Sequence, residues 1–173
     1  MKKILFTIVT FTLLAGYASA QKGNNQLSVG VQGEFFLGDF ANYYNAGIGG
    51  SVKGLYGVGS SGQLSLSTGY TTFTGKGLAN GQTFSIIPAL LGYRFNCKSG
   101  FYLEPQAGVT FNTTHFGNGT YSGTDSMTEF GGALNVGYTV SGFDFSVHYL
   151  SEGDVFSLMG VKVAYNFSLG GKK

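Results

Sequence analysis

Residues 101 to 111 alternate between apolar and polar side chains at nearly every position, and this alternation restricts the fold more than any other feature of the chain. Side chains of a β-strand point alternately to its two faces, so Leu103 and Phe111 share one face while Glu104 and Gln106 lie on the other. At eleven residues, the stretch is longer than the usual soluble strand of about five or six residues and matches the roughly 9–11 that cross a bilayer at a tilt. The pattern therefore predicts a strand with one face in lipid.

Eight segments of the chain show this period of two. They are Gln26–Phe36, Asn45–Gly57, Gln63–Phe73, Thr83–Asn96, Gly100–Asn112, Thr128–Val140, Gly142–Leu150 and Val155–Phe167. The fourth is the least regular, because Pro88 lacks a backbone donor for the ladder and the apolar residues around it blur the alternation. We expect Ile87 and Leu91 to face outward and a β-bulge or a barrel rim at Pro88.

The charged residues of these segments all fall opposite the apolar face, although the faces were assigned from apolar residues alone. They are Glu34, Lys53, Arg94, Glu104, Glu129, Asp144 and Lys162. A basic side chain turned into lipid at mid-depth costs about 2–4 kcal/mol, so such charges belong inside a barrel. We expect them to form an interior polar network with His148, and Gln32, Gln106 and Asn135 to help fill the interior.

The connections between the segments alternate in length, with the one exception of Ser151–Asp154, which is short where a long connection is expected. Leu37–Tyr44, Thr74–Gln82 and Thr113–Met127 are long, whereas Val58–Gly62, Cys97–Ser99 and Ser141 are short. Outer-membrane barrels place short turns on the periplasmic side and long loops outside, and an even strand count brings both termini to the turn side. The sequence therefore predicts an all-β, eight-stranded antiparallel up-and-down transmembrane β-barrel. A barrel of this size encloses only enough room for side chains, so we expect a plugged polar interior rather than a pore.

The first twenty residues have the pattern of a secretory signal peptide. Lys2 and Lys3 precede an apolar run from Ile4 to about Ala15, and a small-residue cleavage signature ends at Ala20. The run is shorter than the ~20 residues of a membrane-spanning helix. We expect residues 1–20 to be removed, residues 21–173 to form the outer-membrane β-barrel domain, and the protein to lie in the bacterial outer membrane.

Composition excludes several other classes of protein. After removal of the signal peptide, the chain has eight basic and eight acidic residues, which gives no basic excess for binding nucleic acid. The single cysteine, Cys97, cannot close an internal disulfide, so we expect a free thiol in a turn. Thirty glycines and 16% aromatic residues with only 10% charged residues favour close-packed strands with aromatic girdles.

Three stretches carry a resemblance to a known family. They are Gly100–Val109, Pro88–Phe95 and Val163–Phe167. These stretches resemble the outer-membrane β-barrel domain family common in Bacteroidetes-type bacteria, and residues 21–173 are similar to the small eight-stranded adhesion/invasion barrels. The resemblance implies insertion by the barrel-assembly machinery, which recognises alternating aromatic residues in the last strand, here Tyr165 and Phe167. The chain departs from that pattern in continuing through residues 168–173.

The sequence offers little support for catalysis. A lipid A-modifying outer-membrane enzyme, an alternative that we keep open, would need His148, Ser151 and Glu152 together. Ser151 is three residues after His148, so in a regular strand the two side chains project from opposite faces. His115 has no Cys or acidic ligand at metal-binding spacing. We therefore expect no catalytic site, no cofactor and no metal.

Aromatic residues in the long connections are candidates for contact with a cell surface, a glycan or a protein. Phe116 and Tyr121 are the candidates in the longest loop. Four further aromatic residues could instead form a girdle at the lipid–water boundary, namely Phe36, Phe40, Tyr43 and Tyr44. The expected partners are outer-membrane lipid and lipopolysaccharide, the barrel-assembly machinery and a host or surface ligand bound through loops, and we expect no nucleic acid partner.

A soluble lipocalin-like ligand-binding barrel is a second alternative, because lipocalins also have eight antiparallel strands. In such a barrel, the apolar face would line the cavity and all the strand charges would lie outside. The outer surface would then be poor in charge for a soluble protein. The direction in which the charged face points decides between the two kinds of barrel.

Overall fold

The computed structural model describes residues 24–58, 61–97, 99–117, 122–153 and 155–169. Within these residues, eight strands form one closed sheet in chain order. They are β1 (Gln26–Leu37), β2 (Gly47–Val58), β3 (Gly62–Thr74), β4 (Gln82–Asn96), β5 (Phe101–Gly117), β6 (Ser122–Val140), β7 (Phe143–Ser151) and β8 (Ser157–Ser168). The predicted signal peptide, residues 1–20, lies outside the described residues.

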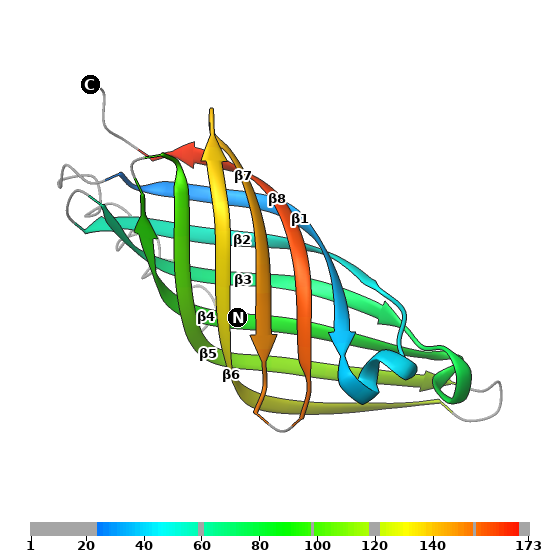
Figure 1. The fold of residues 1–173 in the computed structure, drawn as a ribbon. Helices are drawn as coiled ribbons and strands as arrows, with labels where there is room; N and C mark the ends of the chain where they lie inside the picture. The colour runs from blue at the N-terminus through cyan, green and yellow to red at the C-terminus, as the bar shows by residue number, and fades with distance from the viewer. Residues whose placement is uncertain (1–23, 59–60, 98, 118–121, 154, 170–173) are drawn as a thin grey trace, which may run out of the picture.

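Each strand pairs with its neighbours in the chain in antiparallel fashion, and β8 pairs with β1 to close the barrel, as Figure 1 shows. The predicted up-and-down eight-stranded barrel is therefore confirmed. Two short 3-10 helices lie in the long connections, η2 (Gly38–Asn42) and η3 (Gly77–Ala79). No helix in the described part of the chain is long and apolar enough to cross a membrane. Below, the turn end is the end with the short connections, and the loop end is the opposite one.

The prediction of a long loop from Thr113 to Met127 was wrong. β5 and β6 continue past the rim as a paired hairpin, with Thr113 opposite Ser126 and Phe116 opposite Gly123. The polarity pattern did not extend this far because the outward positions carry Thr, Ser and His in place of apolar residues. Threonine still favours strands through its branched Cβ. One wall of the barrel is therefore much taller than the wall formed by β7, β8 and β1 (Figure 1).

The predicted β-bulge or rim at Pro88 is also wrong. The pairs Thr68–Ala89 and Thr71–Ile86 have the same register on either side of the proline, so no residue is inserted. The ladder to β3 simply lacks pairs at this point, whereas Pro88 still stands opposite Thr110 of β5. Pro88 lines the cavity in the middle of the lumen, and β4 continues on both sides of it.

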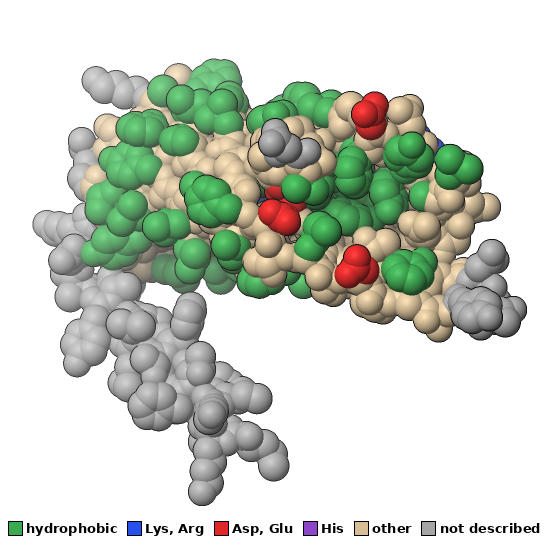
Figure 2. All heavy atoms as spheres, turned by 90° about the horizontal axis from the view of Figure 1, so that it is seen from below, with side chains coloured by type: hydrophobic (Ala, Val, Ile, Leu, Met, Phe, Trp, Pro, Cys, Tyr) green, Lys and Arg blue, Asp and Glu red, His purple; other side chains and the backbone are tan. Residues whose placement is uncertain are grey.

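Large apolar side chains cover the outside of the barrel, as predicted. Ile87 and Leu91 are among them, along with residues from every strand such as Val31, Ile48 and Phe130. Hydrophobic side chains cover much of the outer surface in Figure 2. Buried charges and amides face the lumen instead, and this orientation excludes the lipocalin-like arrangement. We call the outer apolar surface the lipid-facing belt.

The interior is polar in its turn-end half and in its middle but largely apolar towards the loop end, which corrects in part the prediction of a plugged polar interior. The loop-end half is filled by buried apolar side chains that form one cluster, here called the aromatic plug. Its members are Phe36, Phe73, Phe84, Ile86, Leu90, Leu150, Phe156 and Leu158. Figure 2 shows hydrophobic side chains gathered inside the hollow on the right of that view, towards the loop end.

The aromatic girdle predicted at the lipid–water boundary is wrong for three of its four residues. Phe36 is buried in the aromatic plug, and Phe40 and Tyr44 pack against the plug from η2 and the segment after it. Tyr43 alone is exposed. Phe36 directly follows the outward-facing Phe35, so its inward orientation follows from strand alternation once the strand is known to reach Leu37.

Candidate functional site

Buried ion pairs link four strands across the turn-end half of the lumen. Glu104 on β5 accepts from Lys53 on β2, with Nζ and Oε1 2.8 Å apart, and from Arg94 Nε on β4 at 2.9 Å. The same guanidinium donates through Nη1 to Asp144 Oδ2 on β7, also at 2.9 Å. Glu104 has no exposed surface. A buried carboxylate is tolerated only when it is paired and hydrogen-bonded, and here both conditions hold.

Tyr102 completes this arrangement, and the sequence reasoning missed it. Its hydroxyl donates to Asp144 Oδ1 at 2.6 Å, and the Arg94 guanidinium carbon lies 3.7 Å from the centre of its ring. A Cβ on Gly137 would overlap the Tyr102 ring, so glycine leaves the room that the ring needs. Only its position in the strand could have identified Tyr102 from the sequence. It lies two residues before Glu104 and therefore on the same face of the strand.

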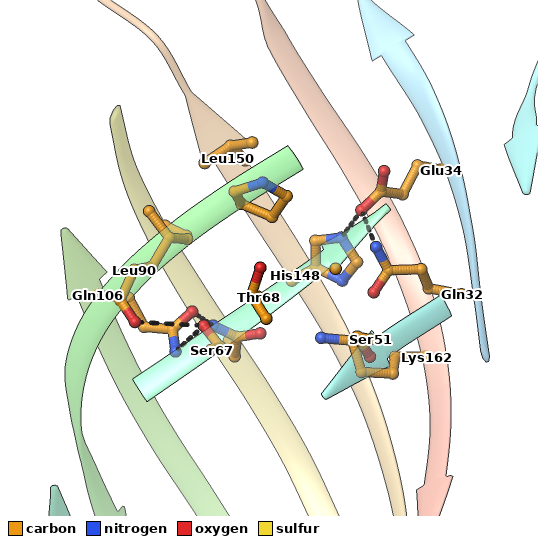
Figure 3. A pocket seen from close by; sticks show the side chains of 14 residues that line it. Gln32, Glu34, Ser51, Ser67, Thr68, Leu90, Gln106, His148, Leu150 and Lys162 are labelled. Atoms are coloured by element: carbon orange, nitrogen blue, oxygen red, sulfur yellow. Dashed lines mark hydrogen bonds and ion pairs between the residues drawn. The ribbon is translucent and has the colours of Figure 1, made fainter. Parts of the chain in front are cut away.

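Polar side chains also meet in the middle of the lumen. His148 Nε2 lies 2.7 Å from Glu34 Oε1, and Gln32 donates to the same oxygen at 3.0 Å. Lys162 lines the same cavity (Figure 3), whose volume is about 40 Å³. A water molecule needs about 10–15 Å³ on this measure, so the space holds only a few waters. Polar side chains thus nearly fill the middle of the barrel.

Not every residue of the predicted interior network joins these contacts. Glu129 is half-buried near the loop end, where its charge acts on Glu152. Ser151 accepts a hydrogen bond from Ser157, so the structure does not place it beside His148 as a hydrolytic site would require. Among the described residues, no group of three or more His, Cys, Asp or Glu side chains is arranged to hold a metal ion.

Glu152 is a buried acid that the sequence reasoning considered only as part of a catalytic group. It follows β7 directly, and Asn112 Nδ2 donates to its Oε2 at 2.6 Å. Oε1 of Glu152 and Oδ1 of Asn112 are buried and lack hydrogen-bond partners within the described structure. Desolvation raises the pKa of the Glu152 carboxyl, and the charge of Glu129 raises it further. A proton on Glu152 would supply a donor to a site with two unpaired acceptors.

We expect Glu152→Gln to remove a pH dependence of stability. A raised pKa in the folded state gives a contribution that is complete below the unfolded value of about 4.3 and is lost as the pH rises through the folded value. The melting temperature of the wild type in detergent should therefore fall as the pH rises from about 4.3 to neutral. The melting temperature of the Gln variant should change less with pH and be higher than that of the wild type at neutral pH. If the melting temperatures of the two proteins changed with pH by the same amount, Glu152 would not be the source of the pH dependence.

The aromatic plug closes the other half of the lumen. The Phe36 ring lies 4.5 Å from the Phe73 ring and 5.1 Å from that of Phe156, measured between centroids. Phe156 belongs to the β7–β8 connection that Glu152 begins. Tilted and edge-on contacts of this kind stabilise aromatic clusters beyond the area that they bury. Side chains of the plug and of the ion pairs thus occupy the lumen on either side of the small central cavity.

The loop-end hairpin, formed by the ends of β5 and β6 beyond Asn112 and Met127, carries one of the two predicted surface-contact residues. Phe116 is 44% exposed near the tip of β5. His115, beside it, lies with Nδ1 2.9 Å from Thr124 Oγ1. Tyr121 lies outside the described residues. At the other end of the chain, Tyr165 and Phe167 project outward from β8, with ring centroids 4.9 Å apart.

Comparisons with known proteins agree on the architecture. No family model and no curated protein matches the chain. Among solved structures, Ail, the attachment invasion locus protein of Yersinia pestis, superposes with a TM-score of 0.66 at 16% identity, covering 85% of this chain and all of Ail. The likeness is one of fold. A second structure of Ail contains the heparin analogue sucrose octasulfate.

Two further solved barrels show the same likeness. Neisserial surface protein A has a TM-score of 0.61 at 14% identity, covering 84% of this chain and 97% of its own. The N-terminal β-barrel domain of Pseudomonas aeruginosa OprF has a TM-score of 0.57 at 18% identity and covers 84% of this chain and all of that domain. The strand count, closure and order found here are therefore those of a small barrel with solved counterparts in several bacteria.

Proposed function

We propose that this protein is an integral outer-membrane barrel with a sealed lumen, and that it acts at the cell surface in a structural or adhesive role. The observation that carries the proposal is the contrast between the two faces of one sheet. Apolar residues cover the outside, whereas Glu104, Arg94 and Asp144 are buried inside. A closed barrel with this polarity leaves no unpaired strand edge and no buried charge in hydrocarbon.

The loop-end hairpin is the part of this barrel that we propose makes surface contacts. It extends farther from the barrel than the other described connections, and Phe116 is exposed near its tip. The described residues of β5 and β6 contain no Lys or Arg. This composition does not favour a polyanion such as the heparin analogue bound by Ail, and it favours an uncharged or aromatic-binding partner.

Biogenesis follows from the same proposal. Residues 1–20 would direct export and be cleaved, and the barrel-assembly machinery would recognise Tyr165 and Phe167 on the closing strand. Their outward orientation on β8 supports this role, since they lie on the face that meets lipid. Membership of the Bacteroidetes-type family stays a prediction from the sequence.

We expect removal of the hairpin tip to separate insertion from adhesion. In the variant, residues 116–123 are replaced by Asn-Gly, a two-residue turn suited to join His115 to its cross-strand partner Thr124. The variant should still enter the outer-membrane fraction and still migrate differently on gels after heating, because the barrel is intact. Adhesion of the expressing cells to host cells or matrix should fall to the level of cells that lack the protein.

The two readouts test different parts of the proposal. A wild-type protein found in the soluble fraction would refute the membrane location. Unchanged adhesion by correctly inserted variant protein would refute the surface role of the hairpin. Replacing residues 59–60, which follow β2 in the sequence, by Asn-Gly is the control, and it should leave adhesion as it is in the wild type.

A further inference from the structure

The outer face of the tall wall changes its chemistry abruptly near the loop end. The cross-strand pairs of β3, β4, β5 and β6 place outward residues in rows that run around the barrel. One row within the lipid-facing belt contains Ala89, Val109 and Phe130, and the next contains Ile87, Phe111 and Thr128. Apolar side chains thus dominate the wall up to this level.

The next two rows contain no apolar and no charged residue. The first is Thr72, Ser85, Thr113 and Ser126, and the second is Thr74, Thr83, His115 and Thr124. We call these eight positions the hydroxyl rows. With strands about 4.8 Å apart and rows about 7 Å apart, the rows cover an area comparable to one or two sugar rings.

The side chains of the hydroxyl rows are already linked to one another. Ser85 donates to Thr72 at 3.5 Å across β4 and β3, and Thr113 and Ser126 share a hydrogen bond of 3.4 Å across β5 and β6. Tyr70, below the rows, also shares a hydrogen bond of 2.9 Å with Ser85. A hydroxyl has one donor and two acceptor positions, so Thr113 and Ser126 can bind further groups while their bond holds. Ser85 is only 5% exposed and serves to position its neighbours. The rows are therefore a partly ordered surface of donors and acceptors.

Charge distinguishes this surface from an ordinary water-facing one. Soluble surfaces mix acidic and basic residues, whereas the hydroxyl rows have none. The nearest charged residues along these strands are Lys76, beyond the end of β3, and Asp125 in β6. Asp125 alternates with Thr124 and Ser126 and therefore lies on the other face of the strand. A phosphate would call for Arg or Lys at the contact, so the rows suit neutral hydroxylated groups better than phosphates.

We propose that the hydroxyl rows bind the neutral sugars of glycolipid in the same leaflet of the membrane. This inference rests on the proposed outer-membrane location, because the rows begin one step above the belt that acyl chains cover. Sugars attached to those chains stand at this level, beside the wall. The ring of Tyr70, which is half exposed below the rows, offers a face for sugar stacking at the boundary.

The test uses the purified full barrel in phospholipid nanodiscs, with lipopolysaccharide from the expressing strain as the probe. The variant Thr83→Val/Thr113→Val/Ser126→Ala removes three hydroxyls and keeps the shapes of the side chains. The control Thr68→Val/Thr128→Val makes the same change at outward positions within the belt. At about 1 kcal/mol for each lost hydrogen bond, the loss of two bonds weakens binding by more than tenfold.

We expect the triple variant to bind lipopolysaccharide at least about tenfold more weakly, while the control binds like the wild type. Equal binding by all three proteins would overturn the proposal. So would tight binding of free oligosaccharides without binding of the lipopolysaccharide, which would assign the rows to an external glycan. Binding is measured on reconstituted protein, whereas the membrane location is tested by cell fractionation. A failure of the binding test can therefore be distinguished from a failure of the proposed location.

Discussion

Glu104→Gln is expected to destabilise the folded barrel by about 3–5 kcal/mol, the usual cost of breaking a buried ion pair from one side. The substitution keeps the shape of the side chain but removes the charge that faces both Lys53 and Arg94. Asp144 remains to balance Arg94, so the ammonium of Lys53 is the group left uncompensated. Urea unfolding in detergent micelles, followed by the loss of the compact gel species, measures the change.

A matched acid and a second variant sharpen this test. Glu129→Gln makes the same chemical change at a half-buried position outside the ion pairs, and it should alter stability by less than about 0.5 kcal/mol. Lys53→Met combined with Glu104→Gln should recover part of the loss, because the ammonium that lost its carboxylate is then removed as well. Equal losses for the two glutamate variants would show that the ion pairs do not hold the turn-end half together.

Phe73→Ala should cost about 3–5 kcal/mol as well, for a different reason. Phe73 has no exposed surface and contacts the rings of Phe36 and Phe84 within the aromatic plug. Truncation leaves a cavity that the stiff barrel wall cannot collapse around. The same urea titration measures the loss, and planar-bilayer recordings should stay without conductance because the ion pairs still close the other half.

The control for Phe73 lies on the outside of the same barrel. Phe95 is 52% exposed on the lipid-facing belt, so Phe95→Ala gives up contacts that flexible acyl chains or detergent can partly replace. Its loss of stability should be clearly smaller than that of Phe73→Ala. If both variants lost the same amount, the plug would contribute nothing beyond ordinary burial, and its assignment as a packed core would fail.

The fold could be predicted because the outer face of every strand follows one rule, the one that the proposed lipid surroundings would enforce. Leu91, Phe111 and Val136 are apolar for that reason, and their period of two fixes the strands and the facing of the charges. No such rule governs the inner face. Phe36 and Phe73 face inward although they are apolar, because a lumen can be filled by any side chains that fit.

Other features depend on contacts far apart in the sequence. Lys53 and Glu104 are 51 residues apart and meet only through the curvature of the closed sheet. The polarity pattern predicted that both face inward, but it could not select partners. The polarity pattern also ended too early on β5, since Thr113 and His115 occupy outward positions beyond the apolar belt, where the apolar rule no longer applies.

The sharing of Glu104 and Arg94 among β2, β4, β5 and β7 has a consequence for assembly. A growing sheet that has not yet curled round holds Arg94 apart from Asp144, which comes from a strand made fifty residues later. In such an open sheet Arg94 can pair with Glu104 on the neighbouring strand. Lys53 and Asp144, however, would stay without a partner, at a high cost in lipid. Joining β8 to β1 removes that penalty in a single event, so we expect insertion and circularisation to be one concerted step, with open forms too costly to accumulate.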